Sequence, residues 1–206
     1  MSGRRVLITA GASGIGLGLA KRFAAGGDRV AVCDADAGAV AQVRAQFPDF
    51  IAVEADVTNE AQMDAFLDRV EAAWGGVDVV CANAGIGGPA GRIEDLNYDA
   101  WRDCVGVNLF GAFLTCRWAA RVMRAQGSGL IILTSSTAGL FGYPLRSPYA
   151  AAKWGIVGLT KTLAMELGPV GVRVNCICPG AVEGDRMERV LANESAATGT
   201  PVDDLR

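Results

Sequence analysis

Short apolar runs alternate along the chain with longer stretches in which apolar positions recur every three or four residues. The apolar runs predict strands at Arg5–Thr9, Arg29–Asp34, Phe50–Glu54, Val77–Ala82, Gly129–Ser135 and Val172–Ile177. The longer stretches predict helices at Gly14–Ala25, Ala37–Gln46, Glu60–Trp74, Tyr98–Ala125 and Tyr149–Leu167. The strand runs are continuously apolar rather than alternating, which is typical of strands that helices cover on both faces. We therefore predict an α/β fold with a doubly wound parallel sheet, in a Rossmann-like three-layer α/β/α arrangement.

The last part of the chain departs from this alternation. One helical stretch, Asp185–Glu194, follows Pro179-Gly180, and the chain reaches Arg206 without another apolar run. A helix in that position would have little sheet to pack against. We therefore expect a single domain over residues 1–206 that is incomplete at its C-terminus and lacks a final strand.

Composition narrows the class of protein. The 206 residues are 51% hydrophobic and carry a net charge of −3, which suits one domain. No apolar run approaches the ~20 residues needed to span a bilayer, and the first one is too short and too early for a secretory signal. Lys and Arg are scattered along the chain, so they form no electrostatic footprint for nucleic acid. We expect a cytoplasmic protein with neither a membrane nor a nucleic-acid partner.

The absence of histidine removes several kinds of site. It excludes Ser-His-Asp and Cys-His hydrolases and every histidine-ligated metal site. No Cys-x-x-Cys motif occurs, and free cysteine is among the most buried residue types, so we expect buried thiols and no metal site. The six cysteines are Cys33, Cys81, Cys104, Cys116, Cys176 and Cys178.

A glycine-rich turn follows the first predicted strand. Gly11, Gly14 and Gly16 form a G-x-x-G-x-G pattern that leads into a helix. Glycines let the backbone turn tightly and approach a pyrophosphate, which the N–H groups of the helix N-terminus favour. Asp34 lies twenty residues past Gly14 at the end of the second strand, where a carboxylate accepts hydrogen bonds from ribose hydroxyls and repels a 2′-phosphate. This predicts NAD rather than NADP; the alternative is that Asp34 is a solvated acid or a helix cap, although Asp36 is the better cap candidate.

A second group of polar residues lies later in the chain. Tyr149 and Lys153 are four residues apart in a predicted helix, so they share one face. A phenol is a poor base at neutral pH, but a nearby ammonium stabilises its phenolate form. Ser136, thirteen residues before Tyr149, follows a strand whose carboxyl end lies at the ligand edge of a parallel sheet. Together these residues suit proton exchange with an alcohol or carbonyl oxygen, for which a cofactor supplies the hydride chemistry.

With these motifs the sequence resembles the short-chain dehydrogenase/reductase (SDR) family in its classical form, over residues 4–187. The resemblance implies an NAD-dependent oxidoreductase for a secondary alcohol or ketone, with a seven-stranded parallel sheet and a dimer or tetramer built through helices 98–125 and 149–167. It implies a catalytic tetrad of Asn108, Ser136, Tyr149 and Lys153, in which Asn108 holds a water in a proton relay to Lys153. It implies cofactor contacts from Gly11, Ser13, Gly14, Ile15, Gly16 and Asp34, from Asp56 and Val57 at adenine, from Asn83, Ala84 and Gly85 at the adenosine ribose, from Tyr149 and Lys153 at the nicotinamide ribose, and from Pro179, Gly180 and Val182 at the nicotinamide.

Two residues depart from the family pattern. Ala10 replaces the usual first glycine of the loop, which adds one methyl group and should be tolerated if φ is negative there. Gly184 stands where many members carry a threonine that hydrogen-bonds the nicotinamide carboxamide. That contact is therefore not expected in this chain.

The substrate should lie between residues 86–92, the loop 138–146 and the segment after Gly180. Arg146 in that loop could meet an acidic substrate, but an exposed loop arginine is more often only solvated, and solvation is the expectation here. Leu140, Phe141, Tyr143, Pro144, Leu145 and Met187 favour a partly apolar pocket. Three alternatives stay open: an NADP-dependent carbonyl reductase, a catalytically silent NAD-sensing module, and an S-adenosylmethionine methyltransferase, which gives no reason for Ser136, Tyr149 and Lys153.

Overall fold

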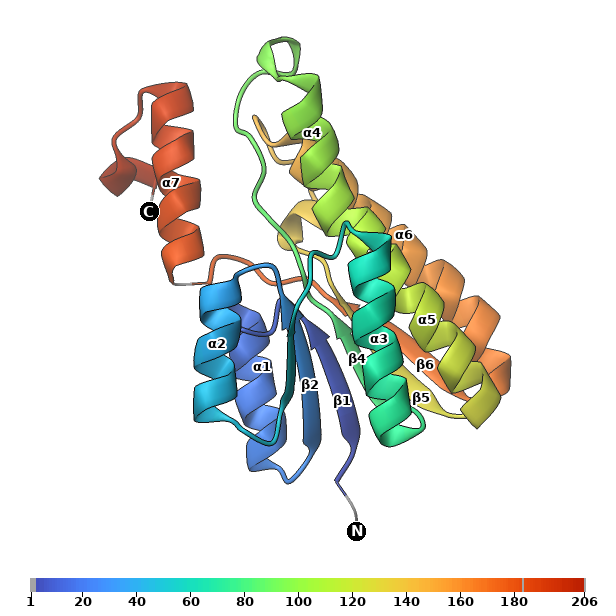
Figure 1. Ribbon diagram of the computed structural model, residues 1–206. Helices are drawn as coiled ribbons and strands as arrows, with labels where there is room; N and C mark the ends of the chain where they lie inside the picture. The colour runs from blue at the N-terminus through green and yellow to red at the C-terminus, as the bar shows by residue number, and fades with distance from the viewer. Residues whose placement is uncertain (1–2, 183, 206) are drawn as a thin grey trace.

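A computed structural model of the chain describes residues 3–182 and 184–205, and it contains one parallel sheet between two layers of helices (Figure 1). The sheet has six strands in the order β3-β2-β1-β4-β5-β6. The strands are β1 (Arg5–Thr9), β2 (Arg29–Asp34), β3 (Ile51–Glu54), β4 (Val79–Ala82), β5 (Gly129–Thr134) and β6 (Val172–Ile177). The α-helices are α1 (Gly14–Ala25), α2 (Ala37–Gln46), α3 (Glu60–Trp74), α4 (Tyr98–Val105), α5 (Gly111–Gln126), α6 (Ser147–Leu167) and α7 (Asp185–Thr198). Short 3₁₀ turns lie at Ile93–Asp95, Thr137–Gly139, Gly168–Val170 and Val202–Leu205.

The two faces of the sheet have separate hydrophobic cores. Alternate residues of β1 show this, since Leu7 packs with α3, α5 and α6, whereas Val6 and Ile8 pack with α1 and α2. All three side chains are fully buried. The prediction of a doubly wound parallel sheet is confirmed. Among the described residues no strand follows β6, which pairs with β5 alone.

The predicted helix 98–125 is interrupted. A π-helical turn, Gly106–Phe110, separates α4 from α5. The side-chain amide of Asn108 donates to the carbonyl of Cys104 at 2.8 Å and to that of Ile86 at 2.9 Å. The Asn108 side chain donates to a carbonyl that would otherwise accept a backbone N–H of the helix. This displacement explains the wide turn.

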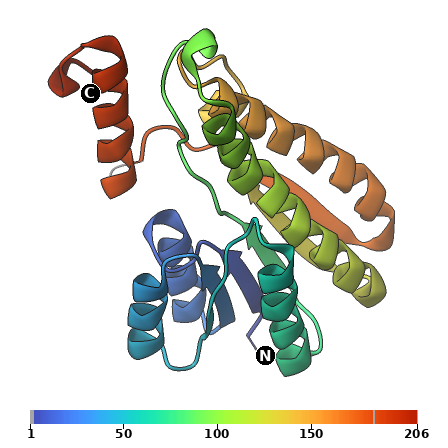
Figure 2. The same cartoon turned by 45° about the horizontal axis from the view of Figure 1, so that its top comes forward.

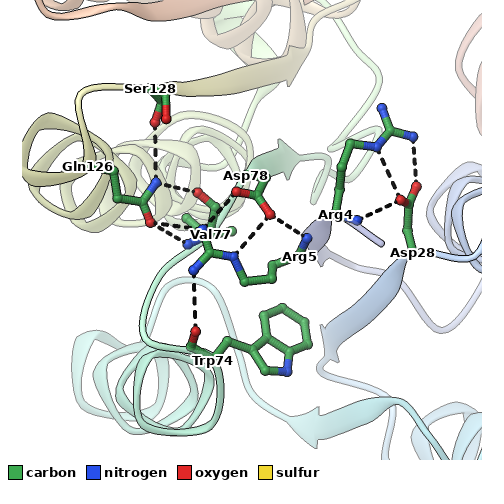
Figure 3. Close-up of polar contacts among 8 residues, drawn as sticks. All are labelled: Arg4, Arg5, Asp28, Trp74, Val77, Asp78, Gln126 and Ser128. Atoms are coloured by element: carbon green, nitrogen blue, oxygen red, sulfur yellow. Dashed lines mark hydrogen bonds and ion pairs between the residues drawn. The ribbon is translucent and has the colours of Figure 1, made fainter. Parts of the chain in front are cut away.

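Polar side chains join the elements at the amino ends of the strands (Figure 3). The backbone N–H of Arg5 and its Nε and Nη2 donate to Asp78 at 2.7, 3.0 and 2.7 Å. The amide of Gln126 donates to the carbonyl of Val77 at 2.7 Å and accepts from its N–H at 2.9 Å. These contacts fix β1 against the segment that leads into β4 and against the end of α5. They lie at the edge of the sheet opposite the predicted site.

Helix α7 stands apart from both helical layers in two views, beyond the carboxyl ends of the strands (Figures 1 and 2). No helix in the described part of the chain combines the length and apolar character that crossing a bilayer requires.

Candidate functional site

The strand order reverses between β1 and β4, and the candidate site lies at the carboxyl ends of these strands. In doubly wound sheets such a reversal opens the crevice in which ligands bind. The chain from β1 into α1, from β4 towards α4 and from β5 into the turn before α6 all start at this edge. The predicted residues on those segments therefore come together.

The glycine loop between β1 and α1 is closely packed. A Cβ on Gly16 would lie 2.0 Å from the carbonyl oxygen of Ala10, and Gly14 has a φ of +50° with open space around it. Ser13 at the N-cap of α1 makes no side-chain capping hydrogen bond. The first N–H groups of α1 therefore remain available to a bound anion, as a pyrophosphate site needs.

The condition for an unstrained alanine at position 10 is not met, because the φ of Ala10 is +49°. It occupies the left-handed region that glycine adopts without strain. The carbonyl of Ala10 accepts from the side-chain amide of Asn83 at 3.3 Å. The loop thus keeps the backbone shape of a glycine at a position that carries a methyl group.

Asp34 and Asp36 have different roles. Asp36 caps α2 by accepting from the N–H of Ala39 at 3.0 Å, as predicted. Asp34 is half-buried and accepts from the N–H of Ala12 at 3.1 Å and from that of Asp36 at 3.2 Å. Its carboxylate therefore fastens the glycine loop to the end of β2, next to the place where a ribose is expected.

Asn83 holds three strands together. Its amide nitrogen donates to the carbonyl of Thr9 at 3.2 Å, and its oxygen accepts from the hydroxyl of Thr134 at 3.2 Å. The Thr9 hydroxyl accepts from the N–H groups of Asn83 and Ala84 at 3.0 and 3.1 Å. Sequence reasoning missed Thr9 and Thr134, although a threonine at the end of an apolar strand run is the signal that could have found them.

Asp56 and Val57 lie at a different part of the same edge. Asp56 accepts from the N–H and the hydroxyl of Thr58, both at 2.8 Å, while buried Val57 fills the space beside Gly111 of α5. Asp56 also lines a hollow of about 480 Å³ between this loop and the α4–α5 junction. These contacts run to α3 and α5 rather than to the residues around Tyr149.

Tyr149 and Lys153 lie in the first turns of α6. The Lys153 side chain is 1% exposed, and its Nζ donates to the carbonyl of Thr134 at 2.9 Å. Nζ lies 5.5 Å from the ring centre of Tyr149. The hydroxyl of Ser135 donates to the Lys153 carbonyl at 2.8 Å, which fixes α6 on the end of β5. A buried ammonium is thereby held beside a half-buried phenol.

Asn108 and Lys153 meet at Gly85. A Cβ on Gly85 would lie 2.6 Å from Oδ1 of Asn108 and 3.2 Å from Nζ of Lys153, so the two polar atoms are at most about 6 Å apart. Oδ1 of Asn108 is buried and accepts no hydrogen bond from the described residues. A buried acceptor of this kind calls for a partner, and a bridging water is the usual one.

Ser136 follows β5 and begins a 3₁₀ turn. Its hydroxyl oxygen accepts from the N–H of Ala138 at 3.2 Å. The N–H of Thr137 donates to the carbonyl of Pro179 at 3.0 Å, and a Cβ on Gly180 would lie 3.9 Å from the Thr137 methyl. The segment after β6 therefore lies against the Ser136 turn. Val182 is more exposed, at 45%.

The loop before α6 differs from expectation. Leu140 and Phe141, predicted to line a pocket, are 45% and 68% exposed, and the Phe141 carbonyl accepts from the indole N–H of Trp154 at 3.4 Å. The ring of Tyr143 packs edge-on against that of Tyr149 with centroids 6.5 Å apart. Burial, followed by the negative charge of Glu194, raises the pKa of Tyr143.

Arg146 is not the exposed, solvated arginine that the sequence predicts. Its side chain is 2% exposed, and Nη2 donates to the carbonyl of Val190 in α7 at 2.8 Å. Packing between α6, α7 and the segment after β4 buries it. It also lines a cavity of about 170 Å³ with Gly85, Ile86, Gly87, Gly88, Arg189, Val190 and Asn193.

The cysteines are free thiols. Cys33, Cys81, Cys104 and Cys116 are buried, and burial raises the pKa of Cys33, Cys81 and Cys116 to about 12 in each case. Cys176 and Cys178 are only partly buried.

Comparison with known proteins identifies the family. The family model for short chain dehydrogenase matches residues 4–195. Levodione reductase of Leifsonia aquatica is 38% identical over 87% of this chain and 69% of its own, and D-beta-hydroxybutyrate dehydrogenase of Cupriavidus necator is 37% identical over 100% and 81%. The crystal structure of NAD+-bound xylitol dehydrogenase superimposes with a TM-score of 0.90 at 31% identity, over 96% of this chain and 78% of that one. The chain belongs to the short chain dehydrogenase family, whose members here are oxidoreductases of alcohols and ketones that use a nicotinamide cofactor.

Proposed function

We propose that this chain is an NAD-dependent oxidoreductase that interconverts a secondary alcohol and its ketone. The observation that carries the proposal is the arrangement at Lys153. Its buried ammonium lies 5.5 Å from the ring centre of Tyr149 and, across Gly85, beside the unpartnered oxygen of Asn108. A buried cation placed there stabilises negative charge on a phenol oxygen during proton exchange.

Each residue of the tetrad has one task in this proposal. In oxidation the Tyr149 oxygen takes the hydroxyl proton of the substrate, while the Ser136 hydroxyl donates a hydrogen bond to the substrate oxygen and orients it. Lys153 Nζ and a water held by Asn108 Oδ1 connect that proton with solvent. NAD, when bound, supplies the hydride acceptor.

The glycine loop and the neighbouring strand ends fit a dinucleotide. The uncapped N-terminus of α1 suits the pyrophosphate, and the Asp34 carboxylate suits ribose hydroxyls rather than a 2′-phosphate. The side-chain amide of Asn83 is already hydrogen-bonded within the protein. Asn83 would therefore hold the strand ends in place beside the cofactor, rather than bind the cofactor through this amide. The proposed contacts are Gly11, Ser13, Gly14, Ile15, Gly16, Asp34, Asp56, Val57, Asn83, Ala84, Gly85, Tyr149, Lys153, Pro179, Gly180 and Val182.

Tyr149→Phe tests the catalytic role. We expect turnover to fall by about 10²–10⁴-fold, because the phenol proton is lost while the ring remains. NADH affinity, measured by fluorescence titration, should fall by no more than about tenfold, since only one of the proposed cofactor contacts, the Tyr149 hydroxyl, is removed. Tyr98→Phe, at an exposed tyrosine outside the site, is the matched control. Unchanged turnover in Tyr149→Phe would contradict the proposal.

Asp34→Asn tests the preference for NAD over NADP. Asparagine keeps an oxygen for the Ala12 N–H but removes the charge, so the ratio of kcat/KM for NAD over NADP should fall at least about tenfold. Asp36→Asn makes the same charge change two residues away and keeps a good cap, so its ratio should not move. A wild-type enzyme that prefers NADP would favour the carbonyl reductase alternative instead.

We propose further that the chain works in a reducing compartment, the cytoplasm, as a homo-oligomer. Free cysteines are the usual state of cytoplasmic proteins. The helices expected at the interface carry large exposed apolar side chains, and such patches mark contacts between proteins. These side chains are Phe110, Phe113, Trp154 and Met165, at 55%, 48%, 51% and 80% exposure.

A further inference from the structure

The guanidinium of Arg146 is buried with only neutral partners. Nη2 donates to the carbonyl of Val190 at 2.8 Å, and Nη1 makes long contacts of 3.4 and 3.5 Å with the carbonyls of Gly88 and Gly87. Nε is buried without a partner, and Arg146 forms no ion pair within the described residues. A guanidinium has five N–H donors, and burying its charge without an anion is costly. The site is therefore short of an anionic acceptor.

The cavity beside Arg146 has the charge and size for one. Among the described residues its lining holds a second cation, Arg189, and an amide, Asn193, and no carboxylate. Glu194, the next residue of α7, lies beside Tyr143, whose pKa is raised by burial and then by the negative charge of Glu194. At about 30 Å³ for each water, the 170 Å³ cavity holds roughly six waters, or one small organic acid.

Gly85 links the cavity to the reacting groups. It forms part of the cavity lining, and a Cβ placed on it would approach Nζ of Lys153 and Oδ1 of Asn108. Arg146 is the N-cap of α6, and Tyr149 is three residues later on the same helix. We therefore expect a small molecule held at Arg146 to extend past Gly85 towards Tyr149.

We propose that this cavity selects hydroxy acids and their keto acids, with Arg146 and Arg189 binding the carboxylate. This rests on the proposed oxidoreductase function and narrows its substrate class. A carboxylate accepts bidentate hydrogen bonds from a guanidinium and neutralises its charge, which a neutral carbonyl or an ester cannot do. The reaction is unchanged: the carbinol carbon gives a hydride to NAD and its hydroxyl gives a proton to Tyr149, while the carboxylate stays intact.

A paired substrate panel tests the selection. Hydroxy acids of four and five carbons that carry a secondary alcohol, at position 2 or 3 and in the five-carbon acid also at position 4, are compared, on the full chain, with their methyl esters. For the best acid we expect kcat/KM at least about 30-fold above that of its ester, and Arg146→Gln should reduce this ratio at least about tenfold. Arg124→Gln, at an exposed arginine of α5, should leave the ratio unchanged. An ester used as well as its acid, or a variant that weakens acid and ester equally, would overturn the proposal.

Binding gives a second readout that needs no turnover. Butyrate should raise the melting temperature of the NAD-saturated protein and butyramide should not. If Arg146→Gln fails to fold, Arg189→Gln, at an exposed position, should abolish the butyrate shift. If the protein oxidises alcohols but butyrate and butyramide shift its melting temperature equally, the carboxylate site is refuted and the proposed function is not. A butyrate-specific shift without any turnover would do the reverse.

Discussion

Ala10 is the residue at which the loop geometry and the side chain conflict. Its φ of +49° is one that β-carbon-bearing residues adopt at a cost of about 1–2 kcal/mol. The conformation is held from two sides, by the Asn83 amide and by the close approach of Gly16. The surrounding packing therefore fixes this backbone, and the side chain tolerates it.

We expect Ala10→Gly and Gly16→Ala to differ sharply. Glycine at position 10 relieves strain but increases unfolded-state entropy, so the free energy of unfolding should change by less than about 1 kcal/mol in urea titrations. Alanine at position 16 would place its Cβ 2.0 Å from the Ala10 carbonyl and force the loop apart. NADH affinity should then fall at least about tenfold, because the backbone donors around a pyrophosphate are displaced. Full affinity in Gly16→Ala would show that the loop is not a cofactor site.

Residues whose partners are close in sequence were predictable, and those with distant partners were not. Asp36 caps a helix three residues on, and Lys153 lies one turn from Tyr149. The acceptors of Arg146 lie 59 and 44 residues away, so nothing local marks this arginine for burial. Asn83 likewise follows a strand as predicted, but the bond between its amide and Thr9 spans 74 residues.

At the scale of elements, the amphipathic pattern located strands and helices but not the break at Asn108. The π-turn is stabilised by one side-chain hydrogen bond, and the apolar residues on either side of it keep their helical spacing. The hydrophobic pattern therefore does not reveal it. The distant carbonyl of Ile86, which shares the Asn108 amide, is a product of the fold. The catalytic roles of the tetrad residues remain predictions.

The contact between Arg5 and Asp78 predicts a pH-dependent stability. Hydrogen bonds from the Arg5 guanidinium hold the pKa of Asp78 below its usual 3.8. Its stabilising contribution is therefore complete above pH 3.8 and is lost as pH falls below it. Because the pair is partly exposed, we expect Asp78→Asn to lower the free energy of unfolding by only about 1 kcal/mol at pH 7.

Urea unfolding at pH 7 and at pH 3 measures this effect, and the difference between wild type and variant should shrink at the lower pH. Asp99→Asn, in an exposed pair with Arg102, should change little at either pH. A difference that grows towards low pH would refute the assignment.

At the scale of the whole molecule, the sheet separates two tasks. The edge shown in Figure 3 carries the ion pairs Arg4–Asp28 and Arg5–Asp78, which fasten the start of β1 to the segments before β2 and β4. The opposite edge carries the glycines and buried polar atoms of the candidate site. The outer helices α5 and α6 carry the exposed aromatic and methionine side chains. The stabilising ion pairs, the candidate site and the proposed oligomer interface thus occupy different surfaces and can be changed separately.

We expect the double substitution Trp154→Glu and Met165→Glu to weaken self-association. Both side chains are more than half exposed on α6, and a buried carboxylate at an interface of two copies is unfavourable. Light scattering should give a lower mass for the variant at equal concentration. Ile93→Glu, at a side chain 72% exposed outside these helices, is the control. A wild type that already scatters as a monomer would contradict the proposed oligomer.

The hydrogen bond between the Trp154 indole and the Phe141 carbonyl has an optical consequence. Trp154 follows Lys153 directly, and its indole is about half exposed, so its emission depends on the loop before α6. Trp118 is buried, but Trp74 and Trp101 are half-buried, so the signal of Trp154 is obtained as the difference from a Trp154→Phe variant. The collisional quenching of Trp154 fluorescence would therefore report, without any added label, a movement of the loop before α6 when a small molecule binds beside Tyr149.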